Sequence, residues 1–189
     1  MDARAGKFWV ELKNEGKAGA AFQIRNHLLP LEAPRRYAVA AGDTLGDFWL
    51  ISDNKSDKRI DNEGRKEPDY DLTLHGPNGF YSQFRGVALG SLGPEVAARY
   101  EGGDVILKLT NTGMKACTFA VRNAYGNASR SVVVQAQESK EERFASDAEH
   151  RWFDLSVTMA EEPAFLRRFA GHVETGQPST SDPGRFLEA

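Results

Sequence analysis

The sequence contains one unit twice. Residues 10–26 read VELKNEGKAGAAFQIRN, and residues 107–123 read LKLTNTGMKACTFAVRN. Set 97 residues apart, the two segments share identical residues at six matched positions: Leu12/Leu109, Asn14/Asn111, Gly16/Gly113, Phe22/Phe119, Arg25/Arg122 and Asn26/Asn123. Residues 70–74 are echoed by 153–157, and residues 84–86 by 169–171. A chain that repeats itself in this way must fold as tandem modules.

Each copy spans roughly 90 to 95 residues, which is enough to bury a core of its own. A hydrophobic content of 40% and a charged content of 27% are ordinary for a soluble globular protein. The net charge of −3 excludes a strongly basic chain, so nucleic acid is not an expected partner.

Hydrophobic residues alternate with period two. Trp9, Glu11 and Lys13 alternate with Val10 and Leu12, and the second copy alternates in the same way from residue 105. Period two over five to seven residues indicates strands with one buried face. Further strands are expected at 36–40, 45–51, 70–76 and 80–86, then at 94–100, 131–136, 142–145, 153–158 and 165–173. The fold class predicted is all-β, with two tandem immunoglobulin-like antiparallel β-sandwiches.

The domain boundaries follow from the repeat. We expect a first sandwich at 1–90, a second at 91–175 and an extended tail at 176–189. The second copy is preceded by PEVAARY, a plausible first strand, whereas the first copy has only residues 1–3 at that offset. The first strand of copy one is therefore expected to be truncated, and the chain to be cut from the C-terminal end of a longer protein.

The sequence offers no catalytic residue and no cofactor site. None of the four histidines has the spacing of a metal site. Asp53, Asp57, Asp61 and Glu63 invite a calcium interpretation, but basic residues interrupt the pattern and a solvated loop is favoured. Cys117 is expected to be a small buried hydrophobe, and a single cysteine cannot form a disulfide within the chain.

Four residues remain as candidates for surface contact. The string HGPNGF is expected to form a hairpin turn, and its functional interpretation is a loop that presents His75 and Asn78. Arg167 and Arg168 could meet phosphate headgroups, although such arginines more often pair with acidic residues across strands.

The tryptophans separate two hypotheses about function. Trp9, Trp49 or Trp152 on an exposed face would favour a binding module, whereas inward positions would make them core residues. The core interpretation is the one favoured.

Two longer strings carry a family resemblance. YDLTLHGPNGFYSQFRG at 70–86, with FDLSV at 153–157 and FLRRFAGHVETGQPSTSDP at 165–183, resembles the C-terminal domain of bacterial phosphocholine-type phospholipase C. The resemblance implies two tandem copies after a large catalytic domain similar to phosphatases of the alkaline-phosphatase type. It implies a secreted or periplasmic enzyme that hydrolyses the headgroup phosphodiester of phosphatidylcholine or sphingomyelin. The HGPNGF turn is replaced in copy two, and no catalytic residue carries over because that domain is absent here.

The resemblance therefore implies non-catalytic accessory domains. The expected partners are the upstream catalytic domain of the same chain and, in addition, a phospholipid membrane surface. The alternative is an independent module that binds lipid headgroups or glycans. A hydrolase within these residues is disfavoured, because the sequence contains no recognisable catalytic set.

Overall fold

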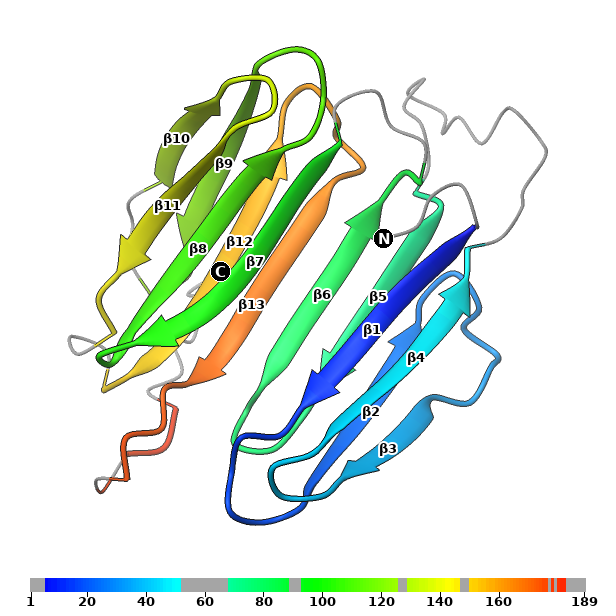
Figure 1. Cartoon of the computed structure of the whole chain (residues 1–189), viewed down its shortest axis with the longest axis vertical. Coiled ribbons are helices and arrows are strands. Elements are labelled where there is room, and N and C mark those ends of the chain that lie inside the picture. The colour runs from blue at the N-terminus through cyan, green and yellow to red at the C-terminus, as the bar shows by residue number, and fades with distance from the viewer. Residues whose placement is uncertain are drawn as a thin grey trace, which may run out of the picture. The chain divides into compact units, whose positions relative to one another are not determined.

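The computed structural model describes residues 6–51, 68–88, 93–125, 129–146, 150–176, 178 and 180–182. Every regular element in this part of the chain is a β-strand, and the pairings are antiparallel (Figure 1). The predicted all-β antiparallel class is confirmed. Among the described residues, no helix is long and apolar enough to cross a membrane.

The chain divides into two compact units. The first comprises Met1–Gly90 together with Glu162–Leu166, and the second comprises Ser91–Glu161 together with Arg167–Ala189.

The first unit contains two sheets built from six strands among its described residues. One sheet has the order β3-β2-β5-β6, and the other pairs β1 with β4. The bounds are β1 Lys7–Lys13, β2 Ala20–Asn26, β3 Arg35–Val39, β4 Thr44–Leu50, β5 Tyr70–His75 and β6 Tyr81–Gly86. Side chains from both sheets meet in one core: Phe8, Leu12, Ile24, Val39, Trp49, Ile51, Tyr70, Leu72 and Leu74. The unit is held together by burial of this apolar surface between two sheets.

The second unit repeats this order with one strand more. Its sheets run β10-β9-β12-β13 and β11-β8-β7. The bounds are β7 Pro94–Glu101, β8 Asp104–Asn111, β9 Cys117–Asn123, β10 Ser129–Val134, β11 Ser139–Phe144, β12 Trp152–Met159 and β13 Leu166–His172. Strands β1 to β6 thus correspond in order to β8 to β13. In the part of the first unit that the structure describes, β7 has no counterpart.

The repeated asparagines explain part of the sequence identity. The Asn111 side chain is fully buried, and its Nδ2 donates to the carbonyl oxygens of Lys115 at 2.8 Å and Val134 at 3.1 Å. Its Oδ1 accepts the backbone N–H of Gly113 at 2.9 Å. One amide therefore ties the turn after β8 to the end of β10, satisfying backbone groups that would otherwise be buried unpaired.

Asn14 makes the same connection in the first unit. Its Nδ2 lies 2.8 Å from the Ala18 oxygen and 3.0 Å from the Val39 oxygen, and its Oδ1 accepts the Gly16 N–H at 2.9 Å. The repeated Asn-x-Gly is thus a structural element of each turn.

Most expected strands lie within a residue or two of their predicted positions, but β11 begins at Ser139 instead of 142, because its pairing with β8 continues to Thr110. Cys117 is buried, as predicted. The acidic loop at 53–63 and the expected strand remnant at 1–3 lie outside the described residues.

Candidate functional site

The hairpin between β5 and β6 holds two of the expected contact residues. Asn78 and Gly79 have φ angles of 53° and 72°, which confirms the expected turn with asparagine and glycine in the left-handed region. His75 is the last residue of β5 and is exposed. Its ring meets Tyr81 edge-on, with the ring centroids 5.0 Å apart. The hairpin therefore presents an imidazole beside a phenol ring.

A row of polar side chains lies next to this hairpin on β5 and β6. The Tyr81 hydroxyl donates to Gln83 Oε1 at 3.1 Å, and Gln83 Nε2 donates to Asp71 Oδ1 at 2.9 Å. The Nε2 of His27 lies 3.0 Å from the Thr73 hydroxyl. The groups bond in two separate sets, Tyr81–Gln83–Asp71 and His27–Thr73, and both sets stabilise the strand pairing.

The other two expected contact residues lie on β13. Arg168 donates through Nε and Nη2 to the Asp154 carboxylate at 2.7 and 2.5 Å. In the first copy Gln83 donates to Asp71 at the corresponding place. Arg167 is buried, with 6% of its surface exposed. The structure thus gives Arg168 an acidic partner across the strands and places Arg167 in the interior.

An arginine connects the two sheets of the first unit. Arg35 on β3 donates to Asp47 Oδ2 at 3.0 Å, and its guanidinium carbon lies 4.2 Å from the centre of the buried Trp49 ring. The Tyr37 hydroxyl also donates to Asp47 Oδ2, at 2.6 Å. Burial raises the pKa of Tyr37, and the Asp47 carboxylate raises it further. Burial alone would raise the pKa of Asp47, but the bonds from Tyr37, a backbone N–H and Arg35 leave that pKa below its usual value.

The second unit contains the same connection. Arg130 on β10 donates to Glu142 Oε2 at 3.1 Å, and its guanidinium lies 4.5 Å from the centre of the Phe144 ring. Both arginines also donate to a backbone carbonyl of the facing strand, Phe48 in one unit and Arg143 in the other. The repeated arginine therefore has a structural role in both copies.

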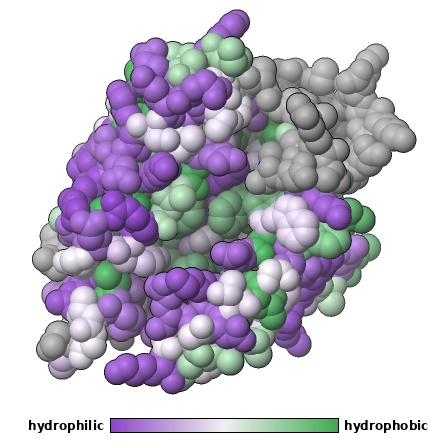
Figure 2. Space-filling model, in the orientation of Figure 1, coloured by the Kyte–Doolittle hydropathy of each residue, from purple (hydrophilic) through white to green (hydrophobic). Residues whose placement is uncertain are grey.

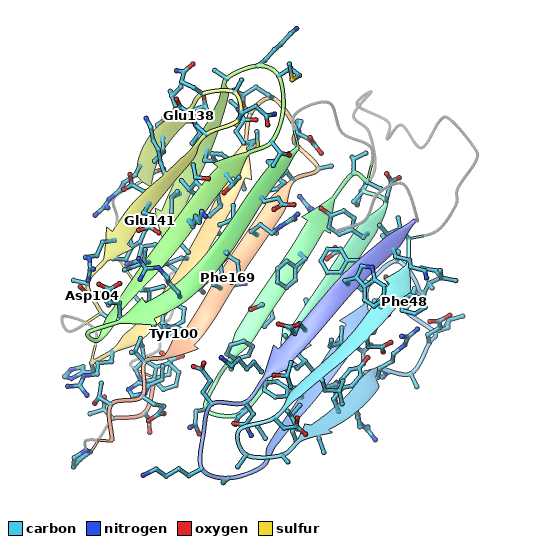
Figure 3. All side chains as sticks on the ribbon, in the orientation of Figure 1. Phe48, Tyr100, Asp104, Glu138, Glu141 and Phe169 are labelled. Carbon is cyan, nitrogen blue, oxygen red and sulfur yellow. The ribbon has the colours of Figure 1, made fainter. Side chains whose placement is uncertain are left out.

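The exposed face of β7, β8 and β11 carries a network of ion pairs. Arg143 bonds to Asp104 at 2.8 Å and to Glu101 at 2.9 Å, and Arg99 bonds to Glu141 at 3.0 Å and also to Glu101. Bonds from Arg99 and Arg143 lower the pKa of Glu101. Figure 3 shows Asp104 and Glu141 on this face. The pairs are solvent-exposed, so each contributes little to stability.

The equivalent face of the first unit is aromatic. Trp9 on β1 lies directly opposite Phe48 on β4, with the ring centroids 5.1 Å apart, and Trp9 is 53% exposed. Leu50 on the same face is 68% exposed. The Lys7 ammonium lies 4.3 Å from the centre of the Phe48 ring. We call Lys7, Trp9, Phe48 and Leu50 the aromatic patch. Figure 3 labels Phe48, and Figure 2 shows hydrophobic and hydrophilic residues side by side on this face of the molecule.

The aromatic patch corrects one expectation. The core assignment is right for Trp49, which is 5% exposed, and wrong for Trp9. Trp152 is half-buried, and its Nε1 donates to the Thr180 carbonyl oxygen at 3.0 Å. The signal for Trp9 was in the sequence, because Trp9 has the same parity as Glu11 and Lys13, both polar.

The first unit has a small pocket, and no metal centre accompanies these surfaces in the part of the chain that the structure describes. A small pocket of about 60 Å³ in the first unit is lined by residues that include Phe8, Leu28, Asp69 and Tyr70. This is well below the ~300 Å³ or more of typical ligand sites. The described residues contain no group of three or more His, Cys, Asp or Glu side chains placed to hold a metal ion.

Comparison with known proteins assigns a family to both copies. The model of the family "Bacterial phospholipase C, C-terminal domain" matches residues 1–87 and again 94–172. The non-hemolytic phospholipase C of Burkholderia pseudomallei is 41% identical over 97% of this chain and 25% of its own length. Two Pseudomonas aeruginosa proteins are also similar. Its non-hemolytic phospholipase C is 35% identical over 92% of this chain, and its hemolytic phospholipase C is 34% identical over 97%. The chain spans 25% to 27% of the length of these relatives.

Proposed function

Because the chain belongs to the family of bacterial phospholipase C C-terminal domains, we propose that its two units are non-catalytic accessory domains of a longer phospholipase C. The observation that carries the proposal is the double match. The family model covers both units, while three quarters of each relative's length lies outside the region that this chain matches. The catalytic domain then lies upstream, and the two units support it.

The architecture suits a supporting role. Each unit has a core closed between two sheets, a buried asparagine that secures a turn and an arginine that connects the sheets. Such modules hold a fixed shape, which is what a domain needs in order to brace a neighbour. The longer enzyme acts on the headgroup phosphodiester of phosphatidylcholine or sphingomyelin, and it is secreted or periplasmic.

A second candidate is a module that binds lipid headgroups or glycans. The observation in its favour is the aromatic patch, where an exposed tryptophan and an exposed leucine lie beside a lysine. Side chains of this kind are typical of surfaces that contact a bilayer interface. In this function His75 and Asn78 at the hairpin, and Arg168 on β13, supply further contacts to the ligand, whereas the buried Arg167 does not.

Two measurements test these functions. The 189-residue chain, the longer enzyme and the longer enzyme without the two units are assayed for release of phosphocholine from phosphatidylcholine and sphingomyelin. We expect no release by the chain alone, and faster heat inactivation of the enzyme that lacks the units. Release by the chain alone would contradict the accessory role, as would an equally heat-resistant shortened enzyme.

The second measurement is pelleting of the chain with phosphatidylcholine vesicles. An accessory role in which the units contact only the catalytic domain predicts that the chain stays in the supernatant. Binding that Phe48→Ala abolishes would favour the second candidate. The matched control is Arg143→Ala, which changes the corresponding position of the second unit.

A further inference from the structure

One edge of β1 differs from the corresponding edge of β8. The Ile51 N–H donates to the Gly6 oxygen at 2.8 Å, and the Asn14 N–H donates to the Asp43 oxygen at 2.9 Å. Gly6 and Asn14, at the two ends of β1, therefore turn these backbone groups toward β4. Backbone groups alternate in direction along an antiparallel strand. The N–H and C=O groups of the intervening residues of opposite parity therefore point to the other edge. These residues are Lys7, Trp9, Glu11 and Lys13.

In the second unit the same edge is occupied. Strand β7 pairs with β8 along its whole length, from Pro94 opposite Asn111 to Glu101 opposite Asp104. Within the described residues of the first unit, β1 has only β4 beside it. An open strand edge with four outward N–H groups is a template for one further strand.

The side chains on this face show the same difference. Ile106 stands at the position of Trp9 and lies between Arg99 on β7 and Arg143 on β11. It is 2% exposed. Trp9 has Phe48 on the β4 side and is 53% exposed. A residue standing opposite Trp9 on an added strand would cover the indole as Arg99 flanks Ile106.

The backbone before β1 indicates where the strand comes from. The connection from β7 to β8 is Gly102-Gly103, with φ angles of 62° and 94°. Gly6 stands at the position of Gly103 and has a φ of 60°. The chain therefore enters β1 through the left-handed glycine that a tight hairpin requires. The family match to the second copy begins at residue 94, so β7 is part of the family's own unit.

We propose that the open edge of β1 is the docking site for one antiparallel strand, supplied by the polypeptide immediately N-terminal to Gly6 in the longer chain. The strand takes the register of β7 on β8 and covers the aromatic patch at Trp9. This inference rests on the proposed function, because the longer phospholipase C supplies the strand. On this proposal the aromatic patch contacts polypeptide of the same longer chain.

The edge is tested first, with a graft. Residues 1–6 of the 189-residue chain are replaced by PEVAARYEGG, the sequence of β7 and its turn. Hydrogen exchange of the peptide 7–13 is then followed by mass spectrometry. We expect the graft to take up about three fewer deuterons at short times, one for each outward amide that this peptide retains, at Trp9, Glu11 and Lys13. The control graft has the same length and carries Ala97→Pro and Arg99→Pro in the grafted copy, which removes two donors to β1.

The source is tested in the longer chain. The same peptide and the oxidation of Trp9 are compared between the 189-residue chain and the longer enzyme. Protection of both in the longer enzyme supports the proposal. Equal exchange in the graft and in its proline control overturns the proposed edge. Equal exchange in the longer enzyme and the 189-residue chain overturns the proposed source. The proposed function fails independently, through the heat-inactivation assay, so the two failures are distinguishable.

Discussion

Replacing Asn111 with alanine should destabilise the second unit more than any other substitution of a polar residue in its turns. The change removes one buried amide that makes three hydrogen bonds, to the oxygens of Lys115 and Val134 and from the N–H of Gly113. Asn111 is 0% exposed, so water does not replace these partners without opening the turn. The Val134 carbonyl and the Gly113 N–H then lose a buried partner, and the Lys115 carbonyl loses a part-buried one.

The size of the destabilisation follows from the number of hydrogen bonds lost. At about 1 kcal/mol for each hydrogen bond lost, Asn111→Ala should cost ~3 kcal/mol of the free energy of unfolding. For a unit of this size, a loss of 1 kcal/mol lowers Tm by roughly 4 to 8 °C, so the transition of the second unit should fall by about 12 to 24 °C. Differential scanning calorimetry measures this shift, and urea unfolding gives the free energy itself.

The matched control is Asn123→Ala. Asn123 is half-buried and accepts one bond, from the Tyr125 N–H at 3.1 Å, so its loss should cost only about 1 kcal/mol. Asn14→Ala should reproduce the large effect in the first unit. A cost for Asn111→Ala no greater than that for Asn123→Ala would show that the repeated asparagine is not what secures the turn.

Three further outcomes are expected. Burial raises the pKa of the Cys117 thiol, so a thiol reagent should label it slowly at neutral pH and completely in denaturant; rapid labelling of the folded protein would contradict this. Asp47→Asn should weaken the connection to Tyr37. Because the folded pKa of Asp47 is lowered, the stabilisation by its carboxylate is present above the ordinary value of 3.8 and is lost as the pH falls through the folded pKa. The stability difference between wild type and variant, measured by urea unfolding, should therefore shrink on acidification, and a constant difference would be evidence against it. Gly86→Ala should cost about 1 to 3 kcal/mol, because a Cβ would lie 2.6 Å from the Tyr70 hydroxyl oxygen. The cost should be smaller in a Tyr70→Phe background, and an equal cost would rule out this clash.

The repeat made most of the fold predictable. Period-two alternation around Val10, Leu12 and Leu109 located the strands, and the Asn-Gly turn at Asn78 followed from backbone chemistry alone. The start of β11 could not be predicted in this way. Its first residues, from Ser139, are polar and exposed, so no alternation marks them, and only pairing with β8 places them in the sheet.

The contacts that give the repeated residues their structural role were harder to predict from the sequence. Arg35 reaches Asp47 across 12 positions of sequence, and the partner in the second unit is a glutamate, Glu142. Neither pair is visible before the two sheets are placed face to face. The core prediction for Trp9 was wrong for another reason. Large aromatic residues are assumed to be core residues even where the alternation of their strand places them on the exposed face.

The two kinds of hairpin differ in what they offer for protein engineering. A buried asparagine spans the turn after β1 and the turn after β8, and in both copies it bonds to the residues two and four positions ahead. Any insertion there would separate the amide from its partners. The β5–β6 connection is 76–80 and the corresponding β12–β13 connection is 160–165, so its length already varies between the two copies. An epitope or a reporter peptide is therefore best inserted at the β5–β6 connection, where a longer loop leaves the core and the asparagine bonds intact.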